Sequence, residues 1–368
     1  MSAGKGLGLV ALGLAAAGAG VALGSVAERK AVRARREGPD REHDEPFGAL
    51  PADRTAIVVA DDGVRLHLEE VGRPDAPLTA VMVHGLANTL GCWHYQRRDL
   101  VHPDDEDLRM VLYDQRGHGR SGRGAADNAT LGQLAEDLLR VLEERVPDGP
   151  LVLFGHSLGG MTILEFLALR PDLLDGRILG VGLLSTSSGA LAETFFGPAA
   201  TAGRVLHPLL DRRLAASPGV RRSGALIDAR RRGSDLSFAL TRRFGFGGAD
   251  VSPSLVEYVQ AVVDVVPAEV VVELLPALLA HEREDSLDAL AEVPTLIVCG
   301  DGDRMTPLAH SRAIAERLPR AQLVTVSGAG HMAHMQSPGY VTMRMRAFIR
   351  QVARHHGLYV RPHGPFPA

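Results

Sequence analysis

The run Gly155-His156-Ser157-Leu158-Gly159-Gly160 has the residue types and spacing for nucleophilic chemistry. A strand-like apolar run, Leu151–Phe154, precedes it, and a helical pattern follows it. A tight strand-to-helix turn requires small residues at positions 155 and 159, and it exposes the Ser157 hydroxyl at the start of the helix. There the N–H of Leu158 points toward a developing oxyanion, with help from the helix dipole. We therefore expect Ser157 to act as a nucleophile.

A serine hydroxyl is a weak nucleophile unless a histidine, itself held by a carboxylate, takes its proton. For a serine on such a turn, the expected chain order is serine, then acid, then histidine. Asp301 and Asp303 follow the apolar run that ends at Cys299, and His331 follows another. Asp301 and Asp303 both remain candidates for the acid, and His334 is a rival to His331 one helical turn away.

The rest of the sequence predicts the elements that position these residues. Strand patterns cover Thr55–Ala60, Val64–Val71, Thr79–Val83, Leu108–Tyr113, Pro150–Phe154, Ile178–Leu184, Thr295–Cys299 and Leu323–Val326, and they alternate with helical patterns such as Leu131–Val146 and Met161–Leu169. This alternation indicates a mostly parallel sheet covered on both faces. From about Ser185 to Pro294 no strand signal occurs, and Leu255–Ala280 is predicted as helix. That insertion is expected to form a cap over the carboxyl ends of the strands.

At this point the sequence resembles the α/β-hydrolase fold family, in the branch of esterases, lipases, cofactor-free haloperoxidases and carbon–carbon bond hydrolases. The resemblance covers about Thr55 to Gln351. Its motifs are His84-Gly85-Leu86, Asp114-Gln115-Arg116-Gly117-His118-Gly119-Arg120-Ser121, the run around Ser157, Gly300-x-x-Asp303 and Gly330-His331. The resemblance implies an eight-stranded, mostly parallel sheet with helices on both faces and a helical cap inserted after strand six.

The resemblance also implies roles for individual residues. Ser157 is the expected nucleophile, Asp303 the acid and His331 the base, and the N–H groups of Leu86 and Leu158 are the expected oxyanion hole. Apart from the resemblance, His84 and Gly85 are candidates to support the oxyanion loop, which follows the third strand, or to line the pocket. His84 is expected to orient that loop through hydrogen bonds rather than to shuttle protons. For His156 and Trp93 two readings stay open, lining the pocket or only packing. No metal or organic cofactor is expected.

The N-terminus carries a different signal. No charged residue occurs from Gly6 to Ala27, so residues 1–27 are expected to be a transmembrane anchor, or a signal peptide cleaved near Ser25-Val26-Ala27. Five basic residues directly after the run, Arg29, Lys30, Arg33, Arg35 and Arg36, place the catalytic domain in the cytoplasm if the anchor is retained, whereas cleavage would give a secreted protein. Residues 28–54 are charged, contain Pro39, Pro46 and Pro51, and are expected to be a linker without packing.

The expected organisation is therefore an anchor, a linker, an α/β core at 55–185 and 290–355, a cap at 186–289 and a C-terminal tail at 356–368. The chain of 368 residues has a net charge of −4, which argues against nucleic-acid partners. Its two cysteines, Cys92 and Cys299, do not suggest a disulfide framework. The patterns leave the oligomeric state undetermined.

The main functional hypothesis is a serine hydrolase of a small hydrophobic or lipid-like carboxylic ester. The alternatives are a cofactor-free perhydrolase or haloperoxidase, a carbon–carbon bond hydrolase, and a non-catalytic receptor for a small ligand on the same fold.

Overall fold

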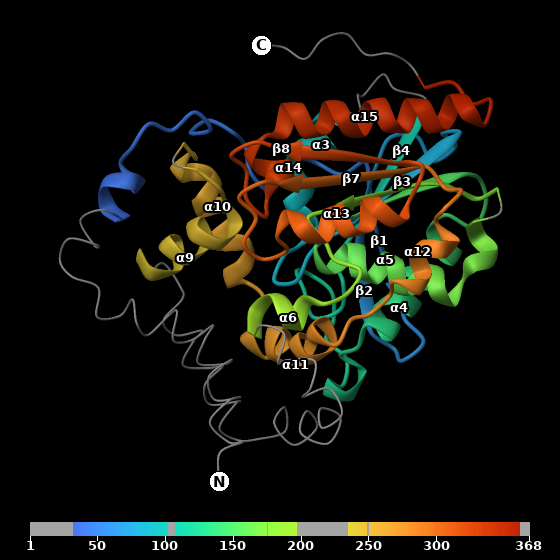
Figure 1. Cartoon of the computed structure of the whole chain (residues 1–368), viewed down its shortest axis with the longest axis horizontal. Coiled ribbons are helices and arrows are strands. Elements are labelled where there is room, and N and C mark those ends of the chain that lie inside the picture. The colour runs from blue at the N-terminus through green and yellow to red at the C-terminus, as the bar shows by residue number, and fades with distance from the viewer. Residues whose placement is uncertain (1–31, 102–106, 175, 197–234, 249, 361–368) are drawn as a thin grey trace.

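Eight strands pair into one sheet in the computed structural model, which describes residues 32–101, 107–174, 176–196, 235–248 and 250–360 (Figure 1). They are β1 (Arg54–Val59), β2 (Arg65–Val71), β3 (Leu78–Val83), β4 (Leu108–Tyr113), β5 (Leu151–His156), β6 (Ile178–Leu184), β7 (Thr295–Gly300) and β8 (Ala321–Val326). Their order across the sheet is β1-β2-β4-β3-β5-β6-β7-β8. Strand β2 pairs antiparallel with β1 and β4, and the other pairs are parallel, which confirms the predicted mostly parallel sheet.

The burial of each strand explains its composition. Strands β3 to β7 are buried along their whole length, as near-continuous apolar runs require when helices cover both faces of a parallel sheet. The two edge strands, β1 and β8, alternate between more and less exposed residues. Because β3, β5, β7 and β8 run in the same direction, the loops that follow them meet at one edge of the sheet.

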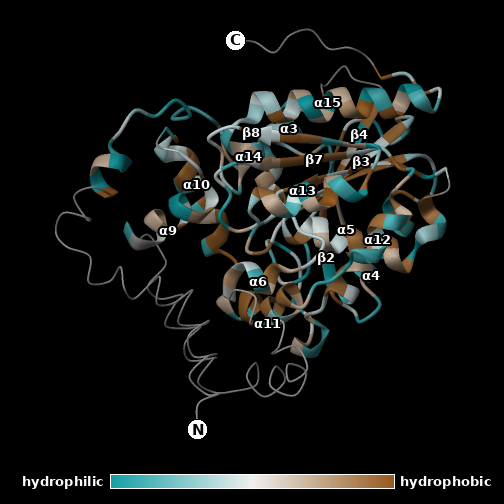
Figure 2. Ribbon diagram, viewed as in Figure 1, coloured by the Kyte–Doolittle hydropathy of each residue, from teal (hydrophilic) through white to brown (hydrophobic). Residues whose placement is uncertain are grey.

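Helices form a layer on each face of the sheet. On one face lie α3 (His94–Leu100), α14 (Ala333–Gln336) and α15 (Pro338–His355), and on the other lie α4 (Leu131–Arg145), α5 (Leu158–Leu169), α12 (Asp285–Ala289) and α13 (Leu308–Arg317). Figure 2 shows the hydrophobic strands β3 and β7 between α15 on one side and α13 and α5 on the other. Short 3-10 helices occur at η1 (Leu90–Trp93), η2 (Ala126–Asn128) and η3 (Pro171–Leu174).

Between β6 and β7 the described residues contain helices and loops but no strand. These are α6 (Leu191–Phe196), α9 (Asp235–Gly245), α10 (Pro253–Asp264), α11 (Ala268–Leu279) and α12, and residues 197–234 of the expected cap lie outside the described part of the chain. The helical content expected at Leu255–Ala280 is confirmed, and it is divided between α10 and α11. A proline disfavours helical backbone at the residue before it, so α10 ends before Pro267 and α11 begins after it. Figure 1 shows α9 with α10, and α6 with α11, at separate places around the core.

Residues 32–53, here called the N-terminal strap, differ from the expected unpacked linker. Arg36 forms ion pairs with Asp235 of α9 at 2.9 Å and with Glu257 of α10 at 3.1 Å. Phe47 stacks on Tyr258 of α10, with ring centroids 4.6 Å apart. The composition alone favoured a solvated segment, but its charges meet opposite charges on the cap helices. The strap therefore packs against the folded domain.

The two chain ends are described only in part. The expected membrane segment at 6–27 lies outside the described residues. Within the part of the chain that is described, no helix is long and apolar enough to cross a membrane. Of the expected C-terminal tail, residues up to 360 are described, and Val360 packs into the same core cluster as α15.

Candidate active site

Ser157 occupies the turn between β5 and α5. Its backbone has φ 53° and ψ −119°, a conformation that non-glycine residues rarely adopt and that costs on the order of 1–3 kcal/mol. The flanking glycines allow the turn, because a Cβ at Gly155 would lie 2.5 Å from the Gly160 nitrogen and one at Gly159 would lie 2.1 Å from the Val83 oxygen. The close approach of strand and helix thus excludes larger side chains at both positions.

Hydrogen bonds on both sides hold the strained residue. The Ser157 N–H donates to the Leu184 carbonyl at 2.9 Å. The Ser157 carbonyl accepts from the Gly160 N–H at 2.9 Å and from Thr186 Oγ1 at 2.7 Å. Such over-determination is what keeps a strained backbone in place.

The loop after β3 lies against this turn, and His84 holds it. His84 is fully buried, donates from Nδ1 to the Gly85 carbonyl at 2.8 Å and accepts at Nε2 from the Gln115 N–H at 2.9 Å. The Gln115 side chain returns a bond to the His84 carbonyl at 2.7 Å. Burial lowers the pKa of His84 to about 4, so the ring is neutral near pH 7. His84 is placed to shape the loop, and both of its ring nitrogens are occupied in doing so.

The same loop carries Leu86, one of the two residues expected to supply the oxyanion hole. Ala87 has φ 55°, and its N–H donates to Nε2 of the buried His118 at 3.2 Å. Among the described residues, no hydrogen bond is made by the N–H of Leu86 or by that of Leu158, the first residue of α5. A Cβ at Gly85 would lie 3.1 Å from the Ser157 Cβ, so this loop is in contact with the serine. The two N–H groups could together bind an oxyanion.

His331 and Asp303 form a buried pair at the same edge of the sheet. Nδ1 of His331 donates to Oδ2 of Asp303 at 3.0 Å and lies 3.1 Å from Oδ1. Asp303 also accepts from the N–H groups of Met305 and Thr306, at 2.8 and 2.9 Å, and from the Thr306 hydroxyl at 3.0 Å. Burial raises the pKa of Asp303, but the charge and hydrogen bond of His331 and these N–H groups outweigh it, so the net pKa is lowered.

The alternative candidates, Asp301 for the acid and His334 for the base, are not part of this pair. Asp301 is exposed, and its Oδ1 accepts from the Gly328 N–H at 2.8 Å. His334 is buried between Trp93, at a ring-centroid distance of 4.9 Å, and His156, at 4.5 Å. Trp93 and His156 are themselves fully buried. The structure therefore brings Asp303, and not Asp301, to His331. The rings of His331, His156, His334 and Trp93 contact one another in that order and form a column.

An apolar cluster packs against the loop after β3, which is the expected oxyanion loop, and against the start of α5. It joins both expected oxyanion residues, Leu158 as a buried member and Leu86 packed against it, to cap helix α11. Its buried members are Leu131, Leu134, Leu158, Met161, Leu191, Val266, Val270, Leu274 and Leu278. Val271, Leu275 and Ala277 of α11 pack against it and are only partly buried. The cap thus brings hydrophobic side chains next to the candidate oxyanion hole.

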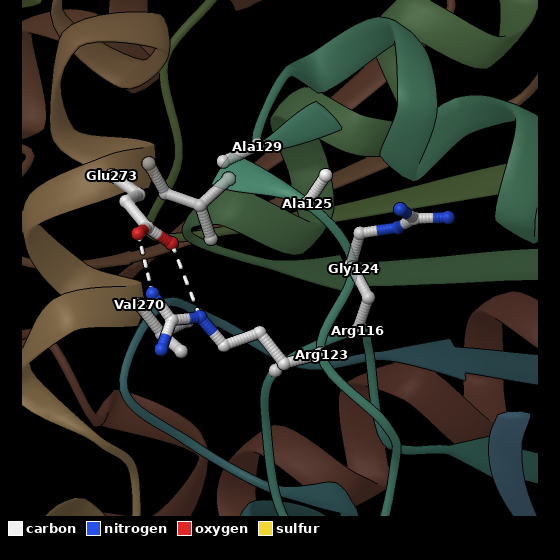
Figure 3. A pocket seen from close by; sticks show the side chains of 9 residues that line it. Arg116, Arg123, Gly124, Ala125, Ala129, Val270 and Glu273 are labelled. Carbon is white, nitrogen blue, oxygen red and sulfur yellow. Dashed lines mark hydrogen bonds and ion pairs between the residues drawn. The ribbon is translucent and has the colours of Figure 1, made fainter. Parts of the chain in front are cut away.

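A surface hollow lies between α11 and the loop at residues 116–129 (Figure 3). Two hydrogen bonds from the Arg123 guanidinium to the Glu273 carboxylate cross it and tie the cap helix to the core. None of the candidate site residues lines this hollow.

The sequence did not predict the roles of two supporting residues, Thr306 and Gln115. Thr306 donates hydrogen bonds to both carboxylate oxygens of Asp303, and Gln115 donates two hydrogen bonds to His84 in the loop after β3. The spacing Asp303-x-x-Thr306 could have indicated the first, because an aspartate commonly accepts from N–H groups two and three residues later. Gln115 bonds to residues 31 positions away, so no local signal existed for its role.

Comparison with known proteins places the chain in one family. Residues 81–338 match the model of a family described as alpha/beta hydrolase fold. A Pseudomonas putida protein, the dihydrolipoyllysine-residue acetyltransferase component of acetoin cleaving system, is 27% identical over 312 residues, 83% of this chain and 72% of the relative. A Stutzerimonas stutzeri protein named as a carbamate hydrolase, RutD, is 28% identical over 268 residues, 72% of this chain and 89% of the relative.

A solved structure gives the same fold. A thermophilic esterase from Thermogutta terrifontis superposes with a TM-score of 0.60 at 24% identity, over 81% of this chain and 99% of the esterase. At that identity the likeness concerns the fold.

Proposed function

Since the chain belongs to the alpha/beta hydrolase fold family and is a hydrolase of that fold, we propose that it hydrolyses a small carboxylic ester with a hydrophobic acyl or aromatic group. Ser157 is the nucleophile, His331 the base and Asp303 the acid that orients the base. The observation that carries the proposal is the buried 3.0 Å contact between His331 Nδ1 and Asp303 Oδ2, at the edge of the sheet where Ser157 sits on its strained turn.

The contact supports a definite direction for each proton transfer in this proposal. Because Nδ1 of His331 donates to Asp303, its Nε2 is the nitrogen left with a lone pair, and it accepts the proton of the Ser157 hydroxyl. The serine oxygen bonds to the ester carbonyl carbon, and the carbonyl oxygen becomes an oxyanion that accepts from the N–H groups of Leu86 and Leu158. The alcohol leaves with the proton from His331. Water then attacks the acyl-enzyme with His331 as base, which frees the acid and Ser157.

The apolar cluster supports a hydrophobic substrate. Leu86 and Leu158, which would supply the oxyanion hole, have their side chains in the same cluster as α11. An acyl chain leaving the carbonyl carbon would therefore meet apolar surface, and its burial is favourable by about 25 cal/mol per Å². Val271 and Leu275, which are only partly buried, are the α11 residues we assign to this contact.

A carbamate is the second candidate, favoured by the likeness to a protein named as a carbamate hydrolase. The same serine, base and oxyanion hole can attack a carbamate carbonyl. The product released with the alcohol or amine separates the two substrates, since an ester gives a carboxylic acid and a carbamate gives carbon dioxide.

The test uses a fluorophosphonate probe and p-nitrophenyl esters of increasing chain length. We expect the wild-type chain to be labelled and to hydrolyse the esters, and Ser157→Ala to lose both. Ser188→Ala, a substitution of a nearby buried serine outside the proposed triad, should keep both. Labelling that persists in Ser157→Ala refutes the nucleophile, and ligand-induced melting shifts without any turnover would favour a receptor.

For the N-terminus we propose that residues 6–27 are a retained membrane anchor with the catalytic domain in the cytoplasm. The support is the uncharged run and the basic residues Arg29, Lys30, Arg33, Arg35 and Arg36 that follow it. Carbonate extraction of membranes tests this, with the intact N-terminus read by mass spectrometry. A soluble protein beginning near residue 28 would show cleavage and secretion instead.

A further inference from the structure

His156 makes a hydrogen bond that joins the nucleophile segment to the base. It is the last residue of β5, directly before Ser157, and its Nε2 lies 3.0 Å from the backbone carbonyl oxygen of His331. A carbonyl oxygen only accepts, so Nε2 carries the proton and Nδ1 does not. The two partners are 175 residues apart in the chain.

The surroundings of His156 keep it neutral and in place. The side chain is fully buried, and its ring centroid lies 4.8 Å from that of His331 and 4.5 Å from that of His334. Burial, reinforced by the neighbouring His334 and His331, lowers the pKa of His156 well below its usual value. Its Nδ1 has no partner among the described residues and lies behind Gly85, where a Cβ would approach it to 2.9 Å.

Neither ring nitrogen of His156 can serve as the base for Ser157. Nε2 is committed to a carbonyl, and Nδ1 is enclosed behind the oxyanion loop. The contribution of His156 to the reaction must therefore come through the residue that it binds.

The loop that carries His331 shows why its carbonyl matters. The N–H of Gly330 donates to Oε1 of Gln336 at 2.9 Å, and the N–H of Met332 donates to the Gly245 carbonyl at 2.7 Å. Those bonds tie the loop to α14 and to the end of α9. The bond from His156 ties the loop to the residue beside the nucleophile.

We propose that His156 is a positioning residue of the proposed reaction, and that its bond to the His331 backbone sets the separation between Ser157 and the base. The proposal rests on the proposed function. Asp303 then orients the ring of His331 through Nδ1, and His156, together with the bonds of Gly330 and Met332, places the backbone that carries the ring. Because residues 156 and 157 are consecutive, any shift of the strand end moves the nucleophile and the base together.

The test compares three variants of the full chain. His156→Phe keeps an aromatic ring but removes the donor, and His156→Gln keeps an N–H donor at a similar reach. His334→Phe is the matched control, because it changes the neighbouring ring in the column and donates no bond to His331. For each we would measure kcat and KM on an ester, the melting temperature, and the downfield NMR signal of the proton between His331 and Asp303.

We expect His156→Phe to lower kcat by about 10- to 100-fold with KM little changed, since a misplaced catalytic group costs rate and not ground-state binding. His156→Gln should recover most of that loss. His334→Phe should stay within about threefold of wild type, because His334 makes no hydrogen bond to His331. The downfield proton should shift or vanish in His156→Phe and persist in the other two variants.

Equal losses in all three variants would reduce His156 to a packing residue and overturn the proposal, as would an unchanged kcat in His156→Phe. If His156→Phe fails to fold, His156→Asn replaces it, because the shorter amide cannot reach the carbonyl. The NMR signal needs no substrate and does not involve Ser157. A chain that turned over no ester would therefore refute the proposed function while still testing the bond from His156.

Discussion

Asp303 Oδ2 lies 3.0 Å from His331 Nδ1, whereas Asp301, two residues earlier on the same loop, bonds to the Gly328 backbone at 2.8 Å. The sequence alone left the two carboxylates as alternatives. The geometry separates them, because β7 ends at Gly300 and the following turn carries Asp303 inward toward the loop after β8.

This difference gives the first prediction. Asp303→Asn should lower kcat by about 10³-fold or more, because the neutral amide no longer stabilises the imidazolium or selects the Nδ1–H tautomer. Asp301→Asn should stay within about threefold of wild type, since its backbone bond lies outside the proposed triad. Steady-state hydrolysis of the best p-nitrophenyl ester measures both. Equal losses in the two variants would remove Asp303 from its assigned role.

The second prediction concerns stability against pH. Burial lowers the pKa of His334 to about 3, from a usual value of 6.5. The unfolded chain therefore takes up a proton below about pH 6.5 that the folded chain does not, and stability falls as pH falls from 6.5 toward 3. His334→Phe removes that proton uptake. Between pH 7 and pH 5 it should reduce the loss of stability by about 2 kcal/mol relative to wild type.

Urea unfolding at several pH values measures this slope. His334→Gln, which also takes up no proton, should give the same slope as His334→Phe even if its stability at pH 7 differs. A slope as steep as that of the wild type in both variants would contradict the expected neutral state of His334.

The third prediction concerns acyl-chain length. Leu275 is partly buried and packs on the cluster that holds Leu86. Leu275→Trp should fill space beside the acyl chain and lower kcat/KM for long esters relative to short ones by about tenfold. Val265→Trp, at a residue 65% exposed between α10 and α11, is the control and should leave the profile unchanged. If a folded Leu275→Trp protein keeps the wild-type profile, α11 does not contact the acyl chain.

The fourth prediction concerns the N-terminal strap. Phe47→Ala removes the ring stacked on Tyr258, whose hydroxyl donates to the Gly91 carbonyl at 2.9 Å. We expect the free energy of unfolding to fall by about 1–3 kcal/mol, less than for a fully buried aromatic. Tyr359→Ala, at a residue 64% exposed, should change it by at most about 0.5 kcal/mol. Comparable urea midpoints for the two variants would mean that the strap adds nothing to the fold.

Much of the core could be predicted from local patterns. The eight strands were placed to within one or two residues, because apolar runs bounded by turn residues are local features. The strained turn at Ser157 was likewise visible in its two flanking glycines. Helices α3 and α13 were not predicted, since the buried side chains of α3 are mostly polar and α13 buries only Ser311 and Ile314.

What could not be predicted depends on contacts between distant residues. Whether Trp93 and His156 line a pocket or pack was left open, and both are fully buried in the structure. The bond from His156 to His331 spans 175 residues, and that from Arg36 to Glu257 spans 221. No window of sequence contains both partners of such a contact. The composition of the strap is therefore typical of a solvated linker, although its charges meet opposite charges on α9 and α10.

The strap also has a consequence for the order of events during synthesis. Its residues are synthesised before the rest of the described domain, yet Glu257 and Tyr258, to which it binds, follow more than 200 residues later. At a bacterial translation rate of about 5–20 residues per second, the strap waits about 10–40 s for its partners. The part of the domain that is made earliest can thus dock only after α9 and α10, the cap helices that it holds, have emerged, when nearly three quarters of these 368 residues have been made.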